Sequence, residues 1–582
     1  MNTDETRIFK KLLLEIIPCY FNAQMDNQSA TNPSRSSLVR LWPWLFVLAV
    51  LLFVGFIRVR LLDMPLERDE GEYAYAGQLM LQGVPPYQLA YNMKFPGTYA
   101  AYAVIIALFG PTPAGIHFGV LCMTTLTALM LFWLGKQILD WTAGMVAATF
   151  YAVLAASPSM LGLAGHATHF AAFFATAGLC GMWKARQNGK WPVVAASGFL
   201  FGVAILMKQH GVVIALWAAI FFTVATLGKS GISPGKRLRT IAIFGAAMIL
   251  PFALCCLILW RAGVFGKFWF WTITYAWQYA SIVPLSESPR FLWQGSRHAL
   301  VKGFLLLPFA AAGALLLWFD GRLAKSRLWV FSFGAASALS VSPDFYFRKH
   351  YFLLMLPGMA LLAGAAVSGL CRWWEQKACP VKFQNWPVWV YAFTMAVTVL
   401  TCANIWFVQD VKTQVSRTTY GADPFPEAEE VAKFIRANSP PSAPMAVLGS
   451  EPELYFLSRR HSVTGYIYTY GMMEPQPFAR RMQKEMIHDI ETAQPGFIIF
   501  VDAPMSWFRQ PDSDLSIFKW WDSYQTNYTL VAIADVLSSN NTVYAWGADM
   551  VKHYGGARGS ALEVYQRTTA LSVHQPNPGA TE

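Results

Sequence analysis

Charged residues are scarce in this chain. Lys, Arg, Asp and Glu make up 13% of its 582 residues, whereas hydrophobic residues make up 55%. Soluble domains carry roughly twice that charged share. The shortage excludes a wholly soluble protein and predicts a polytopic membrane protein with a soluble part attached. The net charge of +12 does not indicate nucleic acid, because Lys and Arg cluster between the apolar runs, as in loops that face anionic lipid.

Cysteine is rare too, and it has no metal-binding spacing. The chain has eight Cys, none after Cys402, and no CxxC pair, which argues against a zinc site or a disulfide framework. Sequence repeats are absent. We expect no cleavable signal peptide, because Arg35 and Arg40 precede an apolar run that is long enough to span a membrane and has no small-residue cleavage site behind it.

Long apolar runs are what the chain has in quantity. Membrane helices need about 17–25 such residues. The runs predict about eleven spans, with soft boundaries, at 40–62, 113–135, 141–158, 167–184, 191–207, 211–228, 240–262, 297–319, 328–343, 351–371 and 387–409. Ile8–Phe21 is amphipathic and is expected on the membrane surface.

Phe95–Gly110 is apolar but short for a span. It begins with Pro96-Gly97 and ends with Gly110-Pro111. We predict a juxtamembrane or re-entrant helix in the outer leaflet. The alternative is a true span, which would move every later loop to the other side of the membrane.

The loops between the spans differ in charge. Lys and Arg gather at 184–190, 229–239, 322–327 and 372–382. The positive-inside rule makes these loops cytoplasmic. Residues 1–39 then form a cytoplasmic segment, 40–409 the transmembrane domain with its first outer loop at 63–112, and 410–582 an extracytoplasmic domain. We expect a bacterial inner (plasma) membrane, with the last domain periplasmic or extracellular.

Residues 410–582 have the pattern of a compact α/β domain. Helices are predicted at 427–438, 478–492 and 514–525, and strands at 445–448, 496–501, 528–534 and 542–546. The domain contains no Cys, so its stability must come from a hydrophobic core.

Acidic residues concentrate directly after the first apolar run, in Glu67-Arg68-Asp69-Glu70-Gly71-Glu72. Charge beside a bilayer is costly, which suggests a functional use. We predict Asp69 as a general base and Glu70 as a positioning or alternative base. A carboxyl at a low-dielectric boundary has a raised pKa, which suits a base near neutrality. The alternative for Asp69 is a salt bridge to Arg68.

The loop continues through Tyr73, Gly83 and Pro85-Pro86-Tyr87 to Lys94-Phe95-Pro96-Gly97. In this order it resembles the polyprenol-phosphate-sugar-dependent glycosyltransferases of GT-C type (family 39-like), in the branch of protein O-mannosyltransferases and the lipid A aminoarabinose transferase. Later segments are similar as well: Gly202…Lys208, His350-Tyr351…Leu356-Pro357-Gly358 and Glu451-Pro452…Leu454-Tyr455-Phe456.

Two positions depart from the family pattern. Many members have Lys-Pro-Pro where this chain has Lys94-Phe95-Pro96. Many also have an Arg and an Asp in the second outer loop, where this chain has Gly165-His166-Ala167-Thr168-His169. A second acidic partner is therefore missing or replaced by His169.

The resemblance implies a GT-C fold, with outer juxtamembrane helices beside the spans, and direct displacement with inversion. A polyprenyl-phosphate-linked sugar would move to a hydroxyl of a lipid, protein or glycan at the outer face. Asp69 would deprotonate that hydroxyl while Lys208 holds the leaving phosphate. Further phosphate contacts are expected from Arg348, Lys94 and His350, and further substrate contacts from Tyr73, Tyr87, His166, His169, His210 and Tyr351.

Three alternatives stay open. The histidines on the outer side, with Asp344, could bind a divalent metal, although no cofactor is certain and no metal ligand set is assigned. The aromatic residues at 263–296 form either an interfacial belt, or a wall for the isoprenoid tail or a stacking surface for the sugar. Other function classes are a lipid or solute transporter, whose charges would lie within the spans, and a non-catalytic scaffold.

Overall fold

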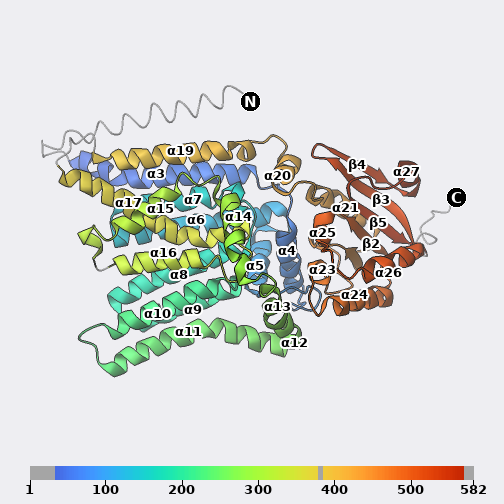
Figure 1. Ribbon diagram of the computed structural model, residues 1–582, viewed down its shortest axis with the longest axis horizontal. Coiled ribbons are helices and arrows are strands. Elements are labelled where there is room, and N and C mark those ends of the chain that lie inside the picture. Colours follow the sequence, from blue (N-terminus) through green and yellow to red (C-terminus); the bar gives the residue numbers. More distant parts are fainter. Residues whose placement is uncertain (1–32, 325, 378–383, 569–582) are drawn as a thin grey trace, which may run out of the picture.

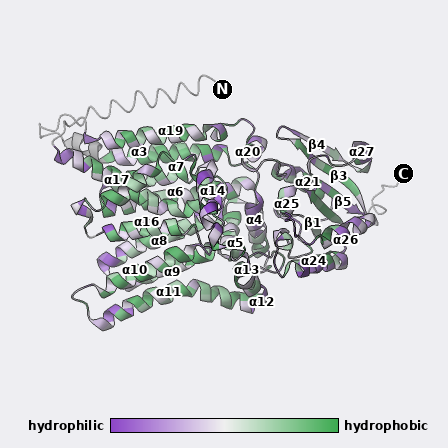
Figure 2. Ribbon diagram, in the orientation of Figure 1, coloured by the Kyte–Doolittle hydropathy of each residue, from purple (hydrophilic) through white to green (hydrophobic). Residues whose placement is uncertain are grey.

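The computed structural model describes residues 33–324, 326–377 and 384–568. A bundle of long helices carries a smaller sheet domain at one end (Figure 1). The bundle helices are mostly hydrophobic, and hydrophilic residues gather at their ends and in the sheet domain (Figure 2). The predicted surface helix at 8–21 lies outside the described residues.

The bundle helices follow the predicted apolar runs, because each run supplies enough apolar surface on all sides to face lipid or other helices. They are α3 (Pro33–Arg60), α6 (Pro113–Ile138), α7 (Trp141–Leu154), α8 (Ala167–Asn188), α9 (Trp191–Met207), α10 (Gly211–Leu227), α11 (Pro234–Arg261), α15 (Leu307–Leu316), α16 (Arg327–Leu339), α17 (Leu356–Gln376) and α19 (Trp386–Trp406). Five helices of the described residues can cross a membrane by length and composition: Leu41–Arg60, Pro113–Ile138, Pro234–Arg261, Lys349–Gln376 and Trp386–Trp406. The count of about eleven spans stays a prediction.

The run predicted as one span at 297–319 is broken. α14 (Ser288–Leu300) ends within this run, turns follow it, and α15 begins at Leu307. Gly303 lies between the two helices, and Pro308 is in the first turn of α15. Glycine favours helix poorly and proline starts a helix more readily than it continues one. The segment before it is helical as well: α12 (Phe265–Trp269), the π-helical turn Phe270–Tyr275 and α13 (Ala276–Ala280).

The first outer loop contains two short helices. α4 (Arg68–Leu81) starts with a capping box, in which Glu67 accepts from the amide of Glu70 at 3.0 Å and Glu70 accepts from the amide of Glu67 at 3.4 Å. α5 (Gly97–Phe109) corresponds to the short apolar run; its 13 residues extend about 20 Å, less than the roughly 30 Å of a hydrocarbon core.

The sheet domain has five strands in the order β1-β2-β5-β3-β4. They are β1 (Met445–Leu448), β2 (Phe497–Asp502), β3 (Tyr528–Ser538), β4 (Asn541–Trp546) and β5 (Ser560–Arg567). β1 and β2 are parallel, and the other pairs are antiparallel. α21 (Phe425–Asn438), α24 (Ala479–Ala493) and α26 (Ser516–Tyr524) contribute to the core around the sheet. The further short helices are α20 (Val411–Tyr420), α22 (Glu453–Ser458), α23 (Tyr470–Met473), α25 (Pro504–Trp507) and α27 (Ala548–Tyr554).

The sheet domain rests on α4, which lies between it and the bundle (Figure 1). The rings of Tyr75 and Tyr455 stack with centroids 5.1 Å apart, and the Tyr75 hydroxyl accepts from the amide of Ser462 at 2.8 Å. A Cβ on Gly71 would meet the Glu453 backbone nitrogen at 2.5 Å. The domain boundary therefore runs along the helix that carries the acidic cluster.

Candidate active site

Arg68 at the start of α4 points into the sheet domain. Its guanidinium donates to the Ser450 carbonyl at 2.6 Å and to Glu451 at 2.8 Å, and it lies 3.6 Å from Asp423. The structure does not pair Arg68 with Asp69, so the salt-bridge alternative for Asp69 is wrong. Arg68 instead fixes the outer domain to α4.

Glu70 points to the opposite side, into the bundle. Its Oε1 accepts from the Gly165 amide at 2.5 Å and lies 3.1 Å from His117 Nε2. Burial raises the pKa of Glu70, but His117 and the Gly165 amide lower it, and the net shift is downward. Glu70 therefore joins α4 to α6 and to the second outer loop, which suits the positioning role more than that of an alternative base.

Lys94 bridges two carboxylates of α4. Its ammonium donates to Asp69 Oδ1 at 2.7 Å and to Glu72 Oε2 at 2.6 Å. Glu72 is completely buried and also accepts from the Tyr99 hydroxyl at 2.5 Å and from Asn92 at 2.9 Å. Such a charge pair is stable only with hydrogen bonds of this kind around it.

Tyr73 and Tyr87, which the sequence predicts as substrate contacts, both contact Lys94. The Lys94 ammonium lies 4.6 Å above the Tyr73 ring, and the Tyr87 hydroxyl donates to the Lys94 carbonyl at 2.7 Å. Both tyrosines are buried, with exposed fractions of 1% and 0%. Their position beneath Lys94 leaves them little surface for a substrate.

The pKa of Asp69 departs from the prediction. Burial alone would raise it, but Lys94, His166 and His350 lower it well below its usual range. The expected rise occurs at a neighbour, because burial and the charge of Asp69 raise the pKa of Glu67. The effect of burial on the pKa of Asp69 is therefore outweighed, first of all by the Lys94 ammonium, which donates directly to the carboxylate.

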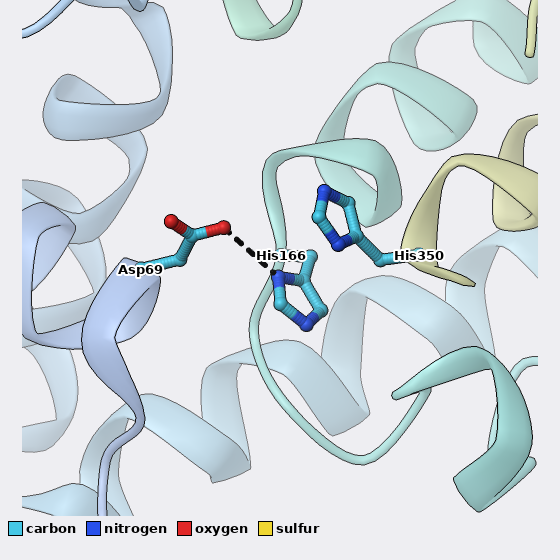
Figure 3. Close-up of side chains that lie close together, drawn as sticks. All are labelled: Asp69, His166 and His350. Atoms are coloured by element: carbon cyan, nitrogen blue, oxygen red, sulfur yellow. Dashed lines mark ion pairs between the residues drawn. The ribbon is translucent and has the colours of Figure 1, made fainter. Parts of the chain in front are cut away.

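Two histidines face Asp69 on its other side (Figure 3). His166 Nδ1 lies 3.6 Å from Asp69 Oδ2, and the His166 and His350 rings stack with centroids 4.2 Å apart. One donor atom from each of the three side chains lies within 4.8 Å of the others. Both ring nitrogens of His166 are buried and have no hydrogen-bond partner among the described residues. A carboxylate and two imidazoles are a donor set that suits a divalent transition metal.

A second polar cluster continues from His350. The Lys208 ammonium lies 4.3 Å above the Tyr351 ring, and the Tyr351 hydroxyl donates to Asp344 at 2.8 Å. His210 packs on the same ring, with centroids 4.3 Å apart, and its Nε2 is 3.8 Å from Asp344. Burial lowers the pKa of Lys208 to about 8, although Asp344 and Asp69 raise it. Lys208 makes no ion pair within the described ranges.

Arg348 directly precedes the short helix Lys349–Met355, which carries His350 and Tyr351, and lies beside the same cluster. It donates to the Tyr279 hydroxyl at 2.8 Å, and its guanidinium lies 5.1 Å from the Tyr346 ring. Lys94, Asp69 and Arg348 all act electrostatically on Lys208, so these groups share one region at the end of the bundle. The structure thus brings together the predicted phosphate ligands and the predicted base.

His169 is the predicted residue that stays apart. It follows His166 by one helical turn in α8, and its Nε2 lies 3.1 Å from the Gly162 carbonyl. The side chain that faces Asp69 is that of His166. The prediction that His169 replaces the missing acidic partner therefore receives no support from the geometry.

The aromatic segment at 263–296 divides between two environments. Phe268 is fully buried and packs on Tyr87, with centroids 5.5 Å apart, and Tyr279 reaches Arg348. Trp277 is 78% exposed. The inner members support the site, and exposed rings such as Trp277 suit a membrane interface.

Tyr468 is a site residue that the sequence did not reveal, as are His117 and Tyr99. It lies in the outer domain, and its hydroxyl donates to Asp69 Oδ1 at 3.1 Å. The two residues are 399 positions apart, and no motif marks the tyrosine. The nearest sequence signal is Glu451-Pro452, which resembles the usual start of the family's outer C-terminal domain and says nothing about Tyr468.

No family model matches the chain, and no curated protein does. Solved structures do match. ArnT from Cupriavidus metallidurans bound to undecaprenyl phosphate has a TM-score of 0.57 at 17% identity, over 91% of this chain and 98% of that one. The same protein in the apo state has a TM-score of 0.54 at 16% identity, over 91% and 99%. The archaeal oligosaccharyltransferase AglB from Archaeoglobus fulgidus, in complex with an inhibitory peptide and a dolichol-phosphate, has a TM-score of 0.50 at 12% identity, over 86% and 74%.

These likenesses define the class. The chain is a multi-pass membrane protein with the GT-C fold, the architecture of polyprenyl-phosphate-associated glycosyltransferases. The predicted fold is thereby confirmed, including a bundle of apolar helices followed by a sheet domain. At identities of 12–17% the likeness extends to the fold, and the chemistry must be argued from the residues.

Proposed function

We propose that the protein transfers a sugar from a polyprenyl-phosphate-linked donor to a hydroxyl group of a lipid, protein or glycan at the outer face of the membrane. The observation that carries this proposal is the meeting of Asp69 with Lys94, Lys208 and Arg348 at one end of an apolar bundle. The ligands of the similar structures, undecaprenyl phosphate and a dolichol-phosphate, support a lipid-phosphate donor.

Asp69 acts as the base in this proposal. Lys94 engages its Oδ1, so Oδ2, which faces His166, is the oxygen left for an acceptor. The acceptor hydroxyl gives its proton to Oδ2 while its oxygen forms a bond to the anomeric carbon. The bond between that carbon and the phosphate oxygen breaks, and the polyprenyl phosphate leaves with the electron pair. One displacement of this kind inverts the anomeric configuration.

Lys208 and Arg348 stabilise the leaving phosphate. Charge grows on the departing oxygen, and fixed cations in a site of low dielectric stabilise such charge strongly. The Arg348 guanidinium keeps donors beyond its bond to Tyr279 and is suited to bidentate phosphate contact. His350 and His210 flank this region, and Tyr351 supports Lys208 from below.

A divalent metal fits the same region. Asp69, His166 and His350 would hold it, and the observation in favour of the fit is that neither buried ring nitrogen of His166 has a hydrogen bond within the described part of the chain. When bound, the metal would supply a Lewis acid next to the donor phosphate. Lys94 already gives Asp69 a cationic partner, so the displacement described above requires only side chains of this chain.

Asp69→Asn tests the proposal, with Asp63→Asn as a matched control in the same outer loop. Asp63 is exposed and lies outside the cluster. We expect mass spectrometry of envelope lipids, glycans and proteins to find a hexose, pentose or amino-sugar mass with the native chain and with Asp63→Asn, but not with Asp69→Asn. All three proteins should fold and bind undecaprenyl phosphate. Sugar transfer by Asp69→Asn at the native level would overturn the proposal.

A further inference from the structure

We propose that Tyr468 of the outer domain is a positioning residue, which fixes the Asp69 carboxylate so that one defined oxygen faces the acceptor. This inference rests on the proposed function, because it assigns a partner to the proposed base. It also makes the reaction centre a joint product of the two domains: the bundle supplies the cations, and the outer domain supplies a hydroxyl.

The contacts of Asp69 carry the inference. Its Oδ1 accepts from Lys94 at 2.7 Å and from the Tyr468 hydroxyl at 3.1 Å. Two donors on one oxygen determine the rotation of the carboxylate, and they leave Oδ2 directed toward His166 at 3.6 Å. With Lys94 alone, the carboxylate could rotate about its bond to Cβ and exchange the two oxygens.

Tyr468 itself is held on both sides. On one side, the Gly465 carbonyl accepts from the Tyr91 amide at 2.6 Å, and a Cβ on Gly465 would lie 2.2 Å from the Tyr91 ring. On the other side, Thr469 donates its amide to the Ser450 hydroxyl at 3.0 Å and its hydroxyl to the Ser506 carbonyl at 3.0 Å. A side chain set between two such anchors can hold a carboxylate in one orientation.

The hydroxyl, rather than the ring, is the group that acts. The Tyr468 ring is half-buried, lies 5.5 Å from the Lys94 ammonium and packs against Tyr470 at a centroid distance of 5.7 Å. Tyr468→Phe keeps these contacts and removes only the bond to Asp69. Packing and positioning are therefore separable by one oxygen atom.

The experiment compares Tyr468→Phe and Tyr468→Ala with the native chain, with Asp69→Asn as the inactive reference. Tyr466→Phe is the matched control, because its hydroxyl binds Glu485 on α24 and does not face Asp69. Each purified protein, in lipid nanodiscs, is titrated with polyprenyl-phosphate sugar extracted from the membranes of producing cells. Initial rates give kcat and KM for the donor, and binding of undecaprenyl phosphate is measured separately.

We expect Tyr468→Phe to lower kcat about tenfold, the effect of losing one hydrogen bond to a charged group. Tyr468→Ala should lose at least as much, whereas Tyr466→Phe should match the native chain. KM for the donor and binding of undecaprenyl phosphate should not change, because the donor phosphate is held by other groups. Unaltered melting temperatures for Tyr468→Phe and Tyr466→Phe would show that both variants are folded.

The two proposals fail in different ways. Native kcat in Tyr468→Phe, with loss only in Tyr468→Ala, would show a packing role and overturn the positioning role alone. A rise in KM without a fall in kcat would also overturn it. Absence of any transfer by the native chain that depends on Asp69 would overturn the proposed function, and the role of Tyr468 with it.

Discussion

Lys208 shows how burial makes a cation sensitive to pH. Its pKa is lowered to about 8, first by burial and against the attraction of Asp344 and Asp69. The ammonium is charged below that pH and loses its proton above it. In the proposed function, phosphate recognition would therefore depend on a group whose pKa lies within the range of ordinary buffers, instead of near its usual value of about 10.4.

Binding of undecaprenyl phosphate should consequently weaken as pH rises from 7 to 9. One unit above its pKa only about a tenth of Lys208 stays charged, so up to about a tenfold loss of affinity is expected. Lys208→Arg should remove the dependence, because arginine keeps its charge at these pH values. Titration of the purified protein with undecaprenyl phosphate at several pH values measures the effect. Lys229→Arg, in a distant loop, should behave like the native chain, and a flat native profile would contradict the prediction.

The sequence predicts Asp69, Lys94 and Lys208 as site residues because they lie next to apolar runs and fit an ordered family motif. The structure brings them into one region, and their roles stay predictions. Which cation meets which acid depends on folding, so the downward pKa shift of Asp69 was missed. Tyr468 was missed for the same reason, since a contact across 399 residues leaves no local pattern.

At the scale of elements, α4 can approach the outer domain only because Gly71 has no side chain. A Cβ at this position would lie 2.5 Å from the Glu453 nitrogen and 2.7 Å from the Glu453 Cβ. The Glu453 backbone cannot move aside as the end of a flexible side chain could. The helix and α22 would have to separate, and the contacts of Arg68 with Glu451 would lengthen.

Gly71→Ala should therefore destabilise the protein, by about 1–3 kcal/mol of overpacking, and lower transfer activity. Gly55→Ala in α3 is the matched control, because nothing lies within 4 Å of its added Cβ, and Ala favours helix over Gly by up to about 1 kcal/mol. Melting curves of the two purified variants measure the difference. Equal or higher stability of Gly71→Ala would show that α4 and α22 are not in such close contact.

Elements with a strong local pattern were predicted well, and β5 was not. β1 matches its predicted range of 445–448, and β2 and β4 begin within one residue of theirs. β5 reads SALEVYQR, which contains Glu and Gln and has no strict alternation. It is a strand because β2 and β3 pair with it on either side. Pairing between distant segments cannot be predicted from the local residue pattern of one sequence.

At the scale of the molecule, the sheet domain and α4 lie at one end of the bundle, and the loop between α10 and α11 lies at the other (Figure 1). That loop contains the exposed Lys229, and Lys236 and Arg237 follow in the first turn of α11. The positive-inside rule predicts that such a loop lies in the cytoplasm and that the sheet domain lies outside.

Side-specific labelling tests this orientation. Ser523→Cys in the sheet domain and Ser230→Cys in the loop after α10 both replace exposed residues. A membrane-impermeant maleimide should label Ser523→Cys in intact spheroplasts, and Ser230→Cys only after permeabilisation. The unmodified chain gives the background of its own cysteines. Labelling of Ser230→Cys in intact spheroplasts would reverse the topology and place the proposed chemistry on the cytoplasmic side.

The order Arg68-Asp69 has a mechanical consequence. Successive side chains on a helix diverge by about 100°. Arg68 therefore binds Glu451 of the outer domain, while Asp69 points in another direction and binds Lys94. A single peptide bond links the two. Under the proposed function, the outer domain could not move away from α4 without breaking the Arg68 contacts or displacing Asp69, so we expect the acceptor to enter from the side.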